Sequence, residues 1–268
     1  NMTSPFNIIS SFRLSFLPPL MIYLAAGVSG LTNIVGLFFV KEYLDLSAAF
    51  LAGLGFWAGL PWVLKMPLGH IVDLIWKFKS ILVFFGALIM AISSLIMYFL
   101  IAHKEEMISV LNAETWFIIS TLLAPIGFVL QDVVADALTV EAIPKTDEKG
   151  NEIDFKTLKS LNVVMQLLGR VSIISGTLIV SFINLIMFSD SSEMSENEKI
   201  VTYGKIYLYS LIVPIISIMG VVFSYISSKS RLNKLIKNGL TFEKAINLIY
   251  PVLKSTKPNK SIITGSII

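Results

Sequence analysis

The chain carries six apolar segments of roughly twenty residues each, and they constrain its fold more than any other feature. They cover about 17–39, 47–68, 80–102, 115–140, 158–188 and 203–227. A helix of that length crosses the hydrocarbon core of a bilayer. Because a lipid-exposed backbone must satisfy its own hydrogen bonds, each segment is expected to be helical. The sequence therefore predicts an all-α membrane protein with six transmembrane helices.

Composition agrees with this prediction and argues against an enzyme. Hydrophobic residues make up 55% of the chain and charged residues 15%, whereas soluble domains carry about 25% charged residues. The chain has no cysteine, which excludes disulfides and thiolate chemistry, and it has only two histidines. No metal-ligand set and no Ser-His-carboxylate grouping is visible. We expect no catalytic activity, no cofactor and no nucleic-acid partner.

The distribution of basic residues predicts the orientation of the chain. With the N-terminus in the cytosol, fifteen of the 21 Lys and Arg residues fall in cytosolic segments, and four fall on the other side. We expect a cytosolic N-terminus (1–16), a six-helix bundle (17–228) and a basic cytosolic linker (229–268). Residues 261–268 turn apolar again, as at the start of a seventh span. The expected location is the plasma (inner) membrane.

Asp132 and Asp136 are the most informative residues, because the fourth segment carries both within its apolar run. Two residues four apart lie one above the other on a helix. An ionised Asp near a bilayer centre costs at least ~2.5 kcal/mol. Two close carboxylates repel, so one of them is expected to hold a proton or another cation through a transport cycle. The alternative places both, with Glu141, at a helix end beyond the hydrocarbon.

The fifth segment carries Asn162, Gln166 and Arg170 at successive spacings of four. This narrow polar stripe is expected to face the bundle interior. Asn162 and Gln166 either contribute to the site or form interhelical hydrogen bonds only. Arg170 falls near mid-membrane, and the Asp pair is its expected partner. Its guanidinium also suits a carboxylate substrate, so an ion pair and a substrate anchor both stay open.

Lys65, between Pro61 and Pro67, is either a lysine that extends to the interface or a second cation that faces the Asp pair. The segment that follows contains Gly69-x-x-x-Asp73 with Lys77 and Lys79. It resembles the cytosolic loop between the second and third helices of the major facilitator superfamily, although Lys-Phe-Lys replaces the usual Arg-Arg cluster. These residues are expected to form a charge latch between helices, which stabilises one state of the transport cycle.

Four stretches together resemble the folate-biopterin transporter family of that superfamily. They are Tyr23-x3-Gly27-x2-Gly30, Lys41-x-x-Leu44-x-Leu46-Ser47, Leu60-Pro-Trp-Val-Leu-Lys65-x-Pro-Leu-Gly69-x3-Asp73 and Asp132-Val-Val-Ala-Asp136-Ala-Leu-x-Val-Glu141. The resemblance spans roughly residues 20–180. It implies a proton-coupled symporter of folates or pterins, with functional roles for Lys65, Asp73, Asp132, Asp136 and Arg170.

The family's carriers have about twelve spans, so the chain resembles their N-terminal half. A functional carrier then needs a second six-helix half or a homodimer as partner, together with the bilayer, H⁺ and a folate- or pterin-like anion. Trp57, Trp62 or Phe128 would stack on the pterin ring. Two alternatives stay open. Gln131, in Gln-Asp-x-x-x-Asp, also fits muropeptide and acetyl-CoA permeases of the superfamily, and a lone half can be a remnant that transports nothing.

Overall fold

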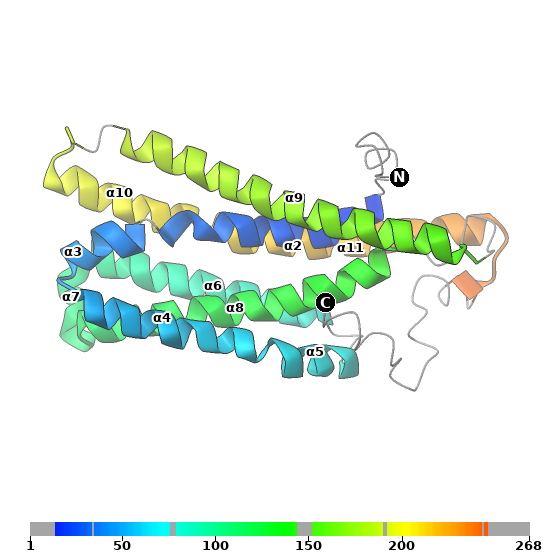
Figure 1. Cartoon of the computed structure of the whole chain (residues 1–268), viewed down its shortest axis with the longest axis horizontal. Coiled ribbons are helices and arrows are strands. Elements are labelled where there is room, and N and C mark those ends of the chain that lie inside the picture. Colours follow the sequence, from blue (N-terminus) through cyan, green and yellow to red (C-terminus); the bar gives the residue numbers. More distant parts are fainter. Residues whose placement is uncertain are drawn as a thin grey trace.

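The structure is a computed structural model, and it describes residues 14–33, 35–75, 79–143, 152–189, 192–242 and 244–245. Every element in these ranges is a helix, and together they form an elongated bundle (Figure 1). The elements are η1 (Leu14–Phe16), α2 (Leu17–Val28), η2 (Ser29–Thr32), η3 (Val35–Val40), α3 (Lys41–Tyr43), α4 (Ala48–Val63), α5 (Lys65–Leu74), α6 (Lys79–Ala102), α7 (Lys104–Val110), α8 (Ala113–Ala142), α9 (Phe155–Phe188), α10 (Glu196–Tyr209) and α11 (Ile212–Lys237).

Six stretches of this bundle are long and apolar enough to cross a membrane, which confirms the six predicted helices and fits an integral membrane protein. They are Leu17–Leu37, Ala48–Val72, Ser80–Ala102, Ala113–Ala142, Phe155–Phe188 and Glu196–Lys237. The last stretch combines α10 and α11 and continues past residue 228 as a helix to Lys237.

Local sequence explains where the long helices begin. Asn112 accepts a hydrogen bond from the backbone N–H of Thr115 at the start of α8, and Asp154 does the same for Thr157 at the start of α9. Ser195 begins α10 with a reciprocal capping box. Such side chains satisfy backbone donors that have no partner in the first helical turn. The helices α8, α9 and α10 therefore each start directly after a polar capping residue.

The first and second spans are broken, and the breaks shape the site. In the first span, α2 ends at Val28 and the chain continues as a 3₁₀ turn (η2) and a π-helical segment (η3). In the second span, α4 ends at Val63 and α5 begins at Lys65. Pro67 has no N–H for the carbonyl of Val63, four residues earlier, so a regular helix cannot continue there. The break places Lys65 at a helix start inside the span.

Three helix pairs meet at glycines. A Cβ on Gly86 of α6 would lie 2.7 Å from the carbonyl oxygen of Gly127 on α8. A Cβ on Gly176 of α9 would lie 2.6 Å from the carbonyl oxygen of Leu24 on α2, and a Cβ on Gly220 of α11 would lie 2.9 Å from the carbonyl oxygen of Pro18 on α2. Close backbone approach at small residues is typical of membrane helix packing. These contacts fix α2 and α8 at the centre of the bundle.

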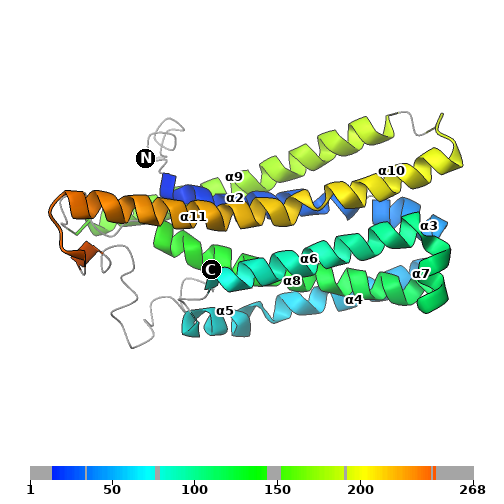
Figure 2. The same cartoon turned by 180° about the vertical axis from the view of Figure 1, so that it is seen from behind.

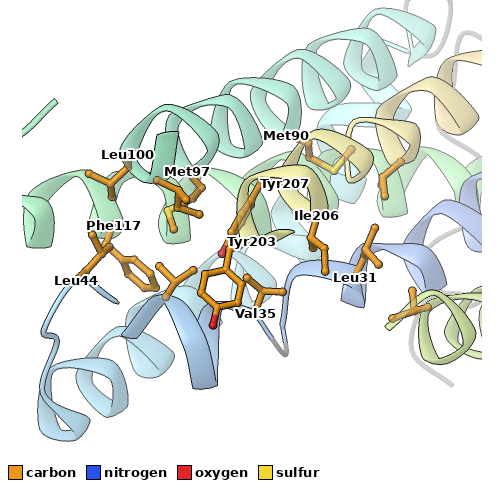
Figure 3. Close-up of a cluster of buried hydrophobic side chains, with 14 of the residues drawn as sticks. Leu31, Val35, Leu44, Met90, Met97, Leu100, Phe117, Tyr203, Ile206 and Tyr207 are labelled. Carbon is orange, nitrogen blue, oxygen red and sulfur yellow. The ribbon is translucent and has the colours of Figure 1, made fainter. Parts of the chain in front are cut away.

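The largest cluster of buried apolar side chains joins η2, η3, α6, α8 and α10. Figure 3 shows Tyr203, Ile206 and Tyr207 of α10 among residues of α6 and the broken first span. Leu31, Val35 and Leu100 are fully buried there. This cluster holds the irregular η2 and η3 segments in place, because their side chains pack on three regular helices.

One face of the bundle is much less covered than the rest. In the most apolar part of each span, 11% of the α4–α5 residues and 17% of the α9 residues are buried, against values between 33% and 44% in the other four spans. Figure 1 shows α4, α8 and α9 toward the viewer, and Figure 2 shows α6, α10 and α11 covering the opposite side. We call the side formed by α4, α5 and α9 the open face.

Candidate functional site

The structure brings Lys65 and both aspartates of α8 together. The ammonium nitrogen of Lys65 lies 2.6 Å from Oδ2 of Asp132 and 2.9 Å from Oδ2 of Asp136. The two carboxylates reach one cation because they lie one turn apart on the same side of α8, and the break at Leu64 turns Lys65 toward them. Of the two interpretations of Lys65, the structure supports the cation that faces the Asp pair.

Tyr23 of α2 completes this cluster. Its hydroxyl group donates a hydrogen bond of 2.8 Å to Oδ1 of Asp136. We call Tyr23, Lys65, Asp132 and Asp136 the charged cluster. Sequence reasoning gave Tyr23 no role, since a tyrosine within an apolar helix does not reveal which neighbour it faces. The only sequence signal was its place in the Tyr23-x3-Gly27 stretch.

The charged cluster is partly accessible and has an odd number of charges. The side chains of Lys65, Asp132 and Asp136 are 38%, 19% and 40% exposed. With every side chain ionised except the phenol of Tyr23, one ammonium faces two carboxylates and one negative charge is in excess. A charge is expensive at membrane depth, so one proton or one bound cation stabilises the cluster. The arrangement can therefore gain and lose one positive charge.

The neighbours of the cluster are apolar or already bonded. Val72, Val133 and Leu138 belong to a buried group that packs with Tyr23. Gln131 is buried, donates to the carbonyl of Val83 on α6 and accepts a hydrogen bond from Ser217 of α11. Both ends of its amide are engaged on the covered side of α8. Gln131 therefore joins three helices, and this role does not distinguish between types of permease.

The predicted interior position of the α9 stripe is wrong. Asn162, Gln166 and Arg170 are all exposed on α9. The physical reason is that the small and apolar residues of α9, among them Leu161 and Gly169, take the side that packs on the bundle. The polar stripe lies beside that contact side, on the open face. The side chain of Asn162 donates only to the carbonyl of Leu158 in its own helix.

The predicted pairing of Arg170 with the Asp pair is also wrong, because Lys65 occupies that position. Among the described residues, Arg170 forms no ion pair within 4.0 Å. A guanidinium therefore lies exposed within a membrane-spanning helix.

The residues of the predicted latch are only partly described. Gly69 and Asp73 lie on α5, which stays helical to Leu74. The prediction of a loop at 69–73 is therefore wrong. The helix persists because Pro67 occupies its first turn, where a missing N–H costs nothing. Lys79 begins α6, and Lys77 lies outside the described residues. The latch itself stays a prediction.

A cavity of about 380 Å³ lies one turn along α8 from the charged cluster. Its wall contains Trp62 and Phe128, which precede Lys65 and Asp132 by three and four residues, but Trp57 does not line it. The described wall carries no Lys, Arg, Asp, Glu or His. Most of its polar groups are hydroxyls from the broken first span, α6, α8 and α10: Ser29, Thr32, Ser93, Ser94, Ser120, Thr121, Tyr207 and Ser210.

Irregular backbone of the first span and prolines of two other helices meet at this cavity. The η2 and η3 segments contribute part of its wall, and so do Pro125 of α8 and Pro214 of α11. Pro125 has no N–H for the carbonyl of Thr121, which also lines the cavity. Irregular backbone at membrane depth is tolerated where it is buried in protein or lines a cavity. The wall is therefore polar and uncharged, and it differs in chemistry from the cluster beside it.

No family model, no curated protein and no solved structure matches this chain. Fold and site define a class: an integral membrane protein with six apolar helices in the described part of the chain, a charged cluster inside its spans and a neutral cavity next to it.

Proposed function

We propose that the protein is a proton-coupled secondary transporter of folate- or pterin-type anions, built as one half of a major-facilitator-type carrier. The observation that supports this most is the contact of Lys65 with both Asp132 and Asp136 inside a membrane-spanning bundle. A site with one excess negative charge can take up one proton and release it. We place the N-terminus on the cytosolic side of the plasma membrane.

The cluster suggests how proton and anion binding are coupled. A lysine ammonium has three N–H donors, and the two aspartates engage two of them. When Asp136 gains a proton, Lys65 loses part of its electrostatic attraction to that residue. A carboxylate of the substrate then becomes the better partner of Lys65. Protonation of Asp136 is therefore expected to strengthen anion binding, which is the requirement for symport.

The neutral cavity suits the ring of such an anion. A volume of about 380 Å³ lies in the range of small-molecule pockets. Trp62 and Phe128 offer aromatic surfaces, and the surrounding hydroxyls can bond with ring nitrogens and carbonyl groups. An uncharged wall disfavours a charged group. The ring would occupy this cavity while the carboxylate approaches Lys65.

The open face supports a second six-helix half as partner, supplied by another half or by a second copy. Side chains there include the exposed Gln166 and the guanidinium of Arg170. Polar side chains that face lipid are costly, whereas a second bundle could pair with them. In such an assembly the charged cluster would face the space between two bundles, and Arg170 would be available to a substrate or to a carboxylate of the partner.

Uptake of labelled folate by folate-auxotrophic cells tests the proposal. Uptake is expected in cells that make the protein, and an uncoupler should abolish it. Asp136→Asn should abolish uptake as well, while the matched control Glu114→Gln, in the first turn of α8, should keep it. Normal uptake by Asp136→Asn would contradict the role of the cluster.

The choice of substrate needs its own measurement. Unlabelled pterins should compete with folate uptake, and muropeptides should not. The reverse pattern would favour the muropeptide-type permease. A protein that reaches the membrane but takes up neither compound would favour a remnant, particularly if native electrophoresis shows a monomer with no second half.

A further inference from the structure

We infer that Tyr23 is a positioning residue that links the charge of Asp136 to the packing of α9 against α2. This inference deepens the proposed transport function and rests on it. The two carboxylates of the charged cluster differ in exposure and in their partners. Asp132 is 19% exposed and contacts Lys65, whereas Asp136 is 40% exposed and has the Tyr23 hydroxyl as a second partner. Asp136 is thus the more accessible of the two carboxylates.

The ring of Tyr23 also lies close to the backbone of α9. A Cβ on Gly169 of α9 would lie 3.1 Å from Cε2 and 3.2 Å from Cδ2 of Tyr23. Only a glycine leaves room for the ring there without displacement. The Tyr23 side chain is therefore held between Asp136 of α8 and the backbone of α9.

The same helix pair is close again two turns farther along α9. The backbones of Gly27 and Gly176 approach so closely that a Cβ on Gly27 would collide with the carbonyl oxygen of Ile173. The two helices have no free space at this contact, so a shift of the Tyr23 ring at Gly169 is expected to change how α9 packs on α2.

The hydrogen bond of Tyr23 depends on the charge of Asp136. A hydrogen bond to an ionised carboxylate is roughly twice as strong as one between neutral groups. When Asp136 gains a proton, the bond loses this strength, and a proton on Oδ1 would require the hydroxyl to turn or to leave. Protonation therefore releases the ring and loosens the contact at Gly169. The adjacent Arg170 lies on the open face, so the movement reaches the surface where substrate or partner would bind.

Lys65 and Tyr23 contact Asp136, Asp132 lies one turn before it on α8, and Tyr23 is the only titratable residue of α2. The surrounding helices also carry His70 and Asp73 on α5, Glu141 on α8 and Arg170 on α9, and the Asp136→Asn variant separates the effect of Asp136 from theirs. The α4 helix and residues 80–102 of α6 contain no Asp, Glu, Lys, Arg or His. A pH-dependent change at the contact of α2 with α9 is therefore expected to follow the charged cluster.

A cysteine placed on α9 tests the link, because the natural chain has none. Ser172 lies between Gly169 and Gly176 and is half-buried, so Ser172→Cys reports on the contact side of α9. The exposed Ser160→Cys on the same helix is the matched control. The measurement is the rate of alkylation by N-ethylmaleimide in lipid nanodiscs across a pH series, with no substrate added.

The alkylation rate at Ser172→Cys, relative to the control, is expected to rise as pH falls. Asp136→Asn should give the higher relative rate at every pH. Tyr23→Phe, which keeps the ring and removes the hydroxyl, should also lose the pH-dependent step. Gly169→Ala disturbs the same contact from α9 and should raise the rate at every pH, which keeps the test decisive if Tyr23→Phe does not fold.

An unchanged step in Tyr23→Phe would overturn the inference, and so would the absence of a step in the natural background. Folate uptake is measured separately. A chain that shows the step but takes up no folate would contradict the proposed substrate alone. A chain that transports folate but keeps the step in Tyr23→Phe would contradict the role of Tyr23 alone.

Discussion

The helices α8 and α9 both cross the membrane and both carry polar residues, but they use them in opposite ways. On α8, Ser120 bonds with Ser93 of α6, and Gln131 bonds with α6 and α11. Asp132 and Asp136 contact α5, and Asp136 also accepts a hydrogen bond from α2. The polar groups of α8 therefore connect it to its neighbours.

Among the described residues, no polar side chain of α9 forms a hydrogen bond with a neighbouring helix. Thr177 and Ser181 are exposed and donate to carbonyls four residues earlier in the same helix. Gln166 and Arg170 are exposed as well. What joins α9 to the bundle is the close approach at Gly169 and Gly176. The difference teaches that α8 organises the interior of this bundle, whereas α9 presents polar chemistry to something outside it.

The largest loss of stability is expected from a substitution that forces α8 away from α6. Gly127→Val would place side-chain atoms against the backbone of Gly86, which cannot rotate away. Overpacking of a core costs about 1–3 kcal/mol where side chains relax, so a backbone collision is expected to cost ~3 kcal/mol or more. Unfolding in mixed micelles measures this loss.

Gly59→Val on α4 is the matched control, because a Cβ there meets nothing within 4 Å. It introduces the same β-branched residue into a helix without a collision. Equal losses of stability in the two variants would mean that the helical preference of valine, rather than the approach of α6 to α8, sets the effect.

Removal of a basic side chain is also expected to affect stability differently at α8 and at α9. Lys65→Met leaves two carboxylates of α8 close together without a cation. Loss of one partner of a buried pair costs 3–5 kcal/mol, and partial exposure reduces this to about 1–2 kcal/mol. Arg170→Met removes a charge that pairs with no described residue, so stability should stay within about 0.5 kcal/mol.

Uptake measured beside stability completes this comparison. We expect both variants to lose folate uptake, and only Lys65→Met to lose stability. A large destabilisation by Arg170→Met would show that the guanidinium supports the bundle itself.

Sequence reasoning predicted where the helices of this bundle lie better than which side of each helix faces its neighbours. An apolar segment of membrane length can be recognised from its own residues alone, and the structure confirms all six. The Asp pair was placed on one side of α8 by its spacing of four. The direction of the Asn162, Gln166 and Arg170 stripe depends on which neighbours α9 packs against, and that information lies in other segments. A periodic stripe identifies a side of a helix but not what covers it.

The charged cluster shows the same limit at the level of single residues. Lys65 was a candidate because a lysine within an apolar segment is costly. Its contact with both aspartates depends on a helix break between Val63 and Lys65, which two prolines suggested but did not locate. Tyr23 is chemically ordinary in an apolar helix, and only its distance from Asp136 gives it a role.

A smaller effect is expected from the serine pair that joins α6 and α8. Ser93 and Ser120 each donate to the other's carbonyl, at 2.7 and 3.0 Å, and both side chains are buried. Ser93→Ala removes one hydroxyl and should cost about 1 kcal/mol. Ser181→Ala on α9 removes an exposed hydroxyl that bonds only within its helix, and it should change stability by less than about 0.5 kcal/mol. Equal effects in unfolding experiments would contradict the different roles of the two helices.

The smallest expected effect is at the helix starts, where pH should distinguish α9 from α8. Asp154 begins α9, and hydrogen bonds from the side chain and the backbone N–H of Thr157 to its carboxylate lower the pKa of Asp154 below its ordinary value. A lowered pKa means that the ionised cap adds stability above the pKa of the unfolded chain, and that this stability is lost as pH falls through the folded pKa. Asn112 begins α8 with a neutral side chain that does not titrate.

Acidification from about pH 6 to about pH 3 should therefore weaken the cap of α9, whereas the cap of α8 has no charge to lose. Asp154→Asn keeps a capping oxygen but removes the titration, so it is the matched variant. The measurement is the melting temperature of the natural chain and of Asp154→Asn at both pH values. The natural chain should lose slightly more stability on acidification than the variant does. An identical pH response in the two proteins would show that the charge of Asp154 does not stabilise the start of α9. The caps of α8 and α9 would then not differ in this respect.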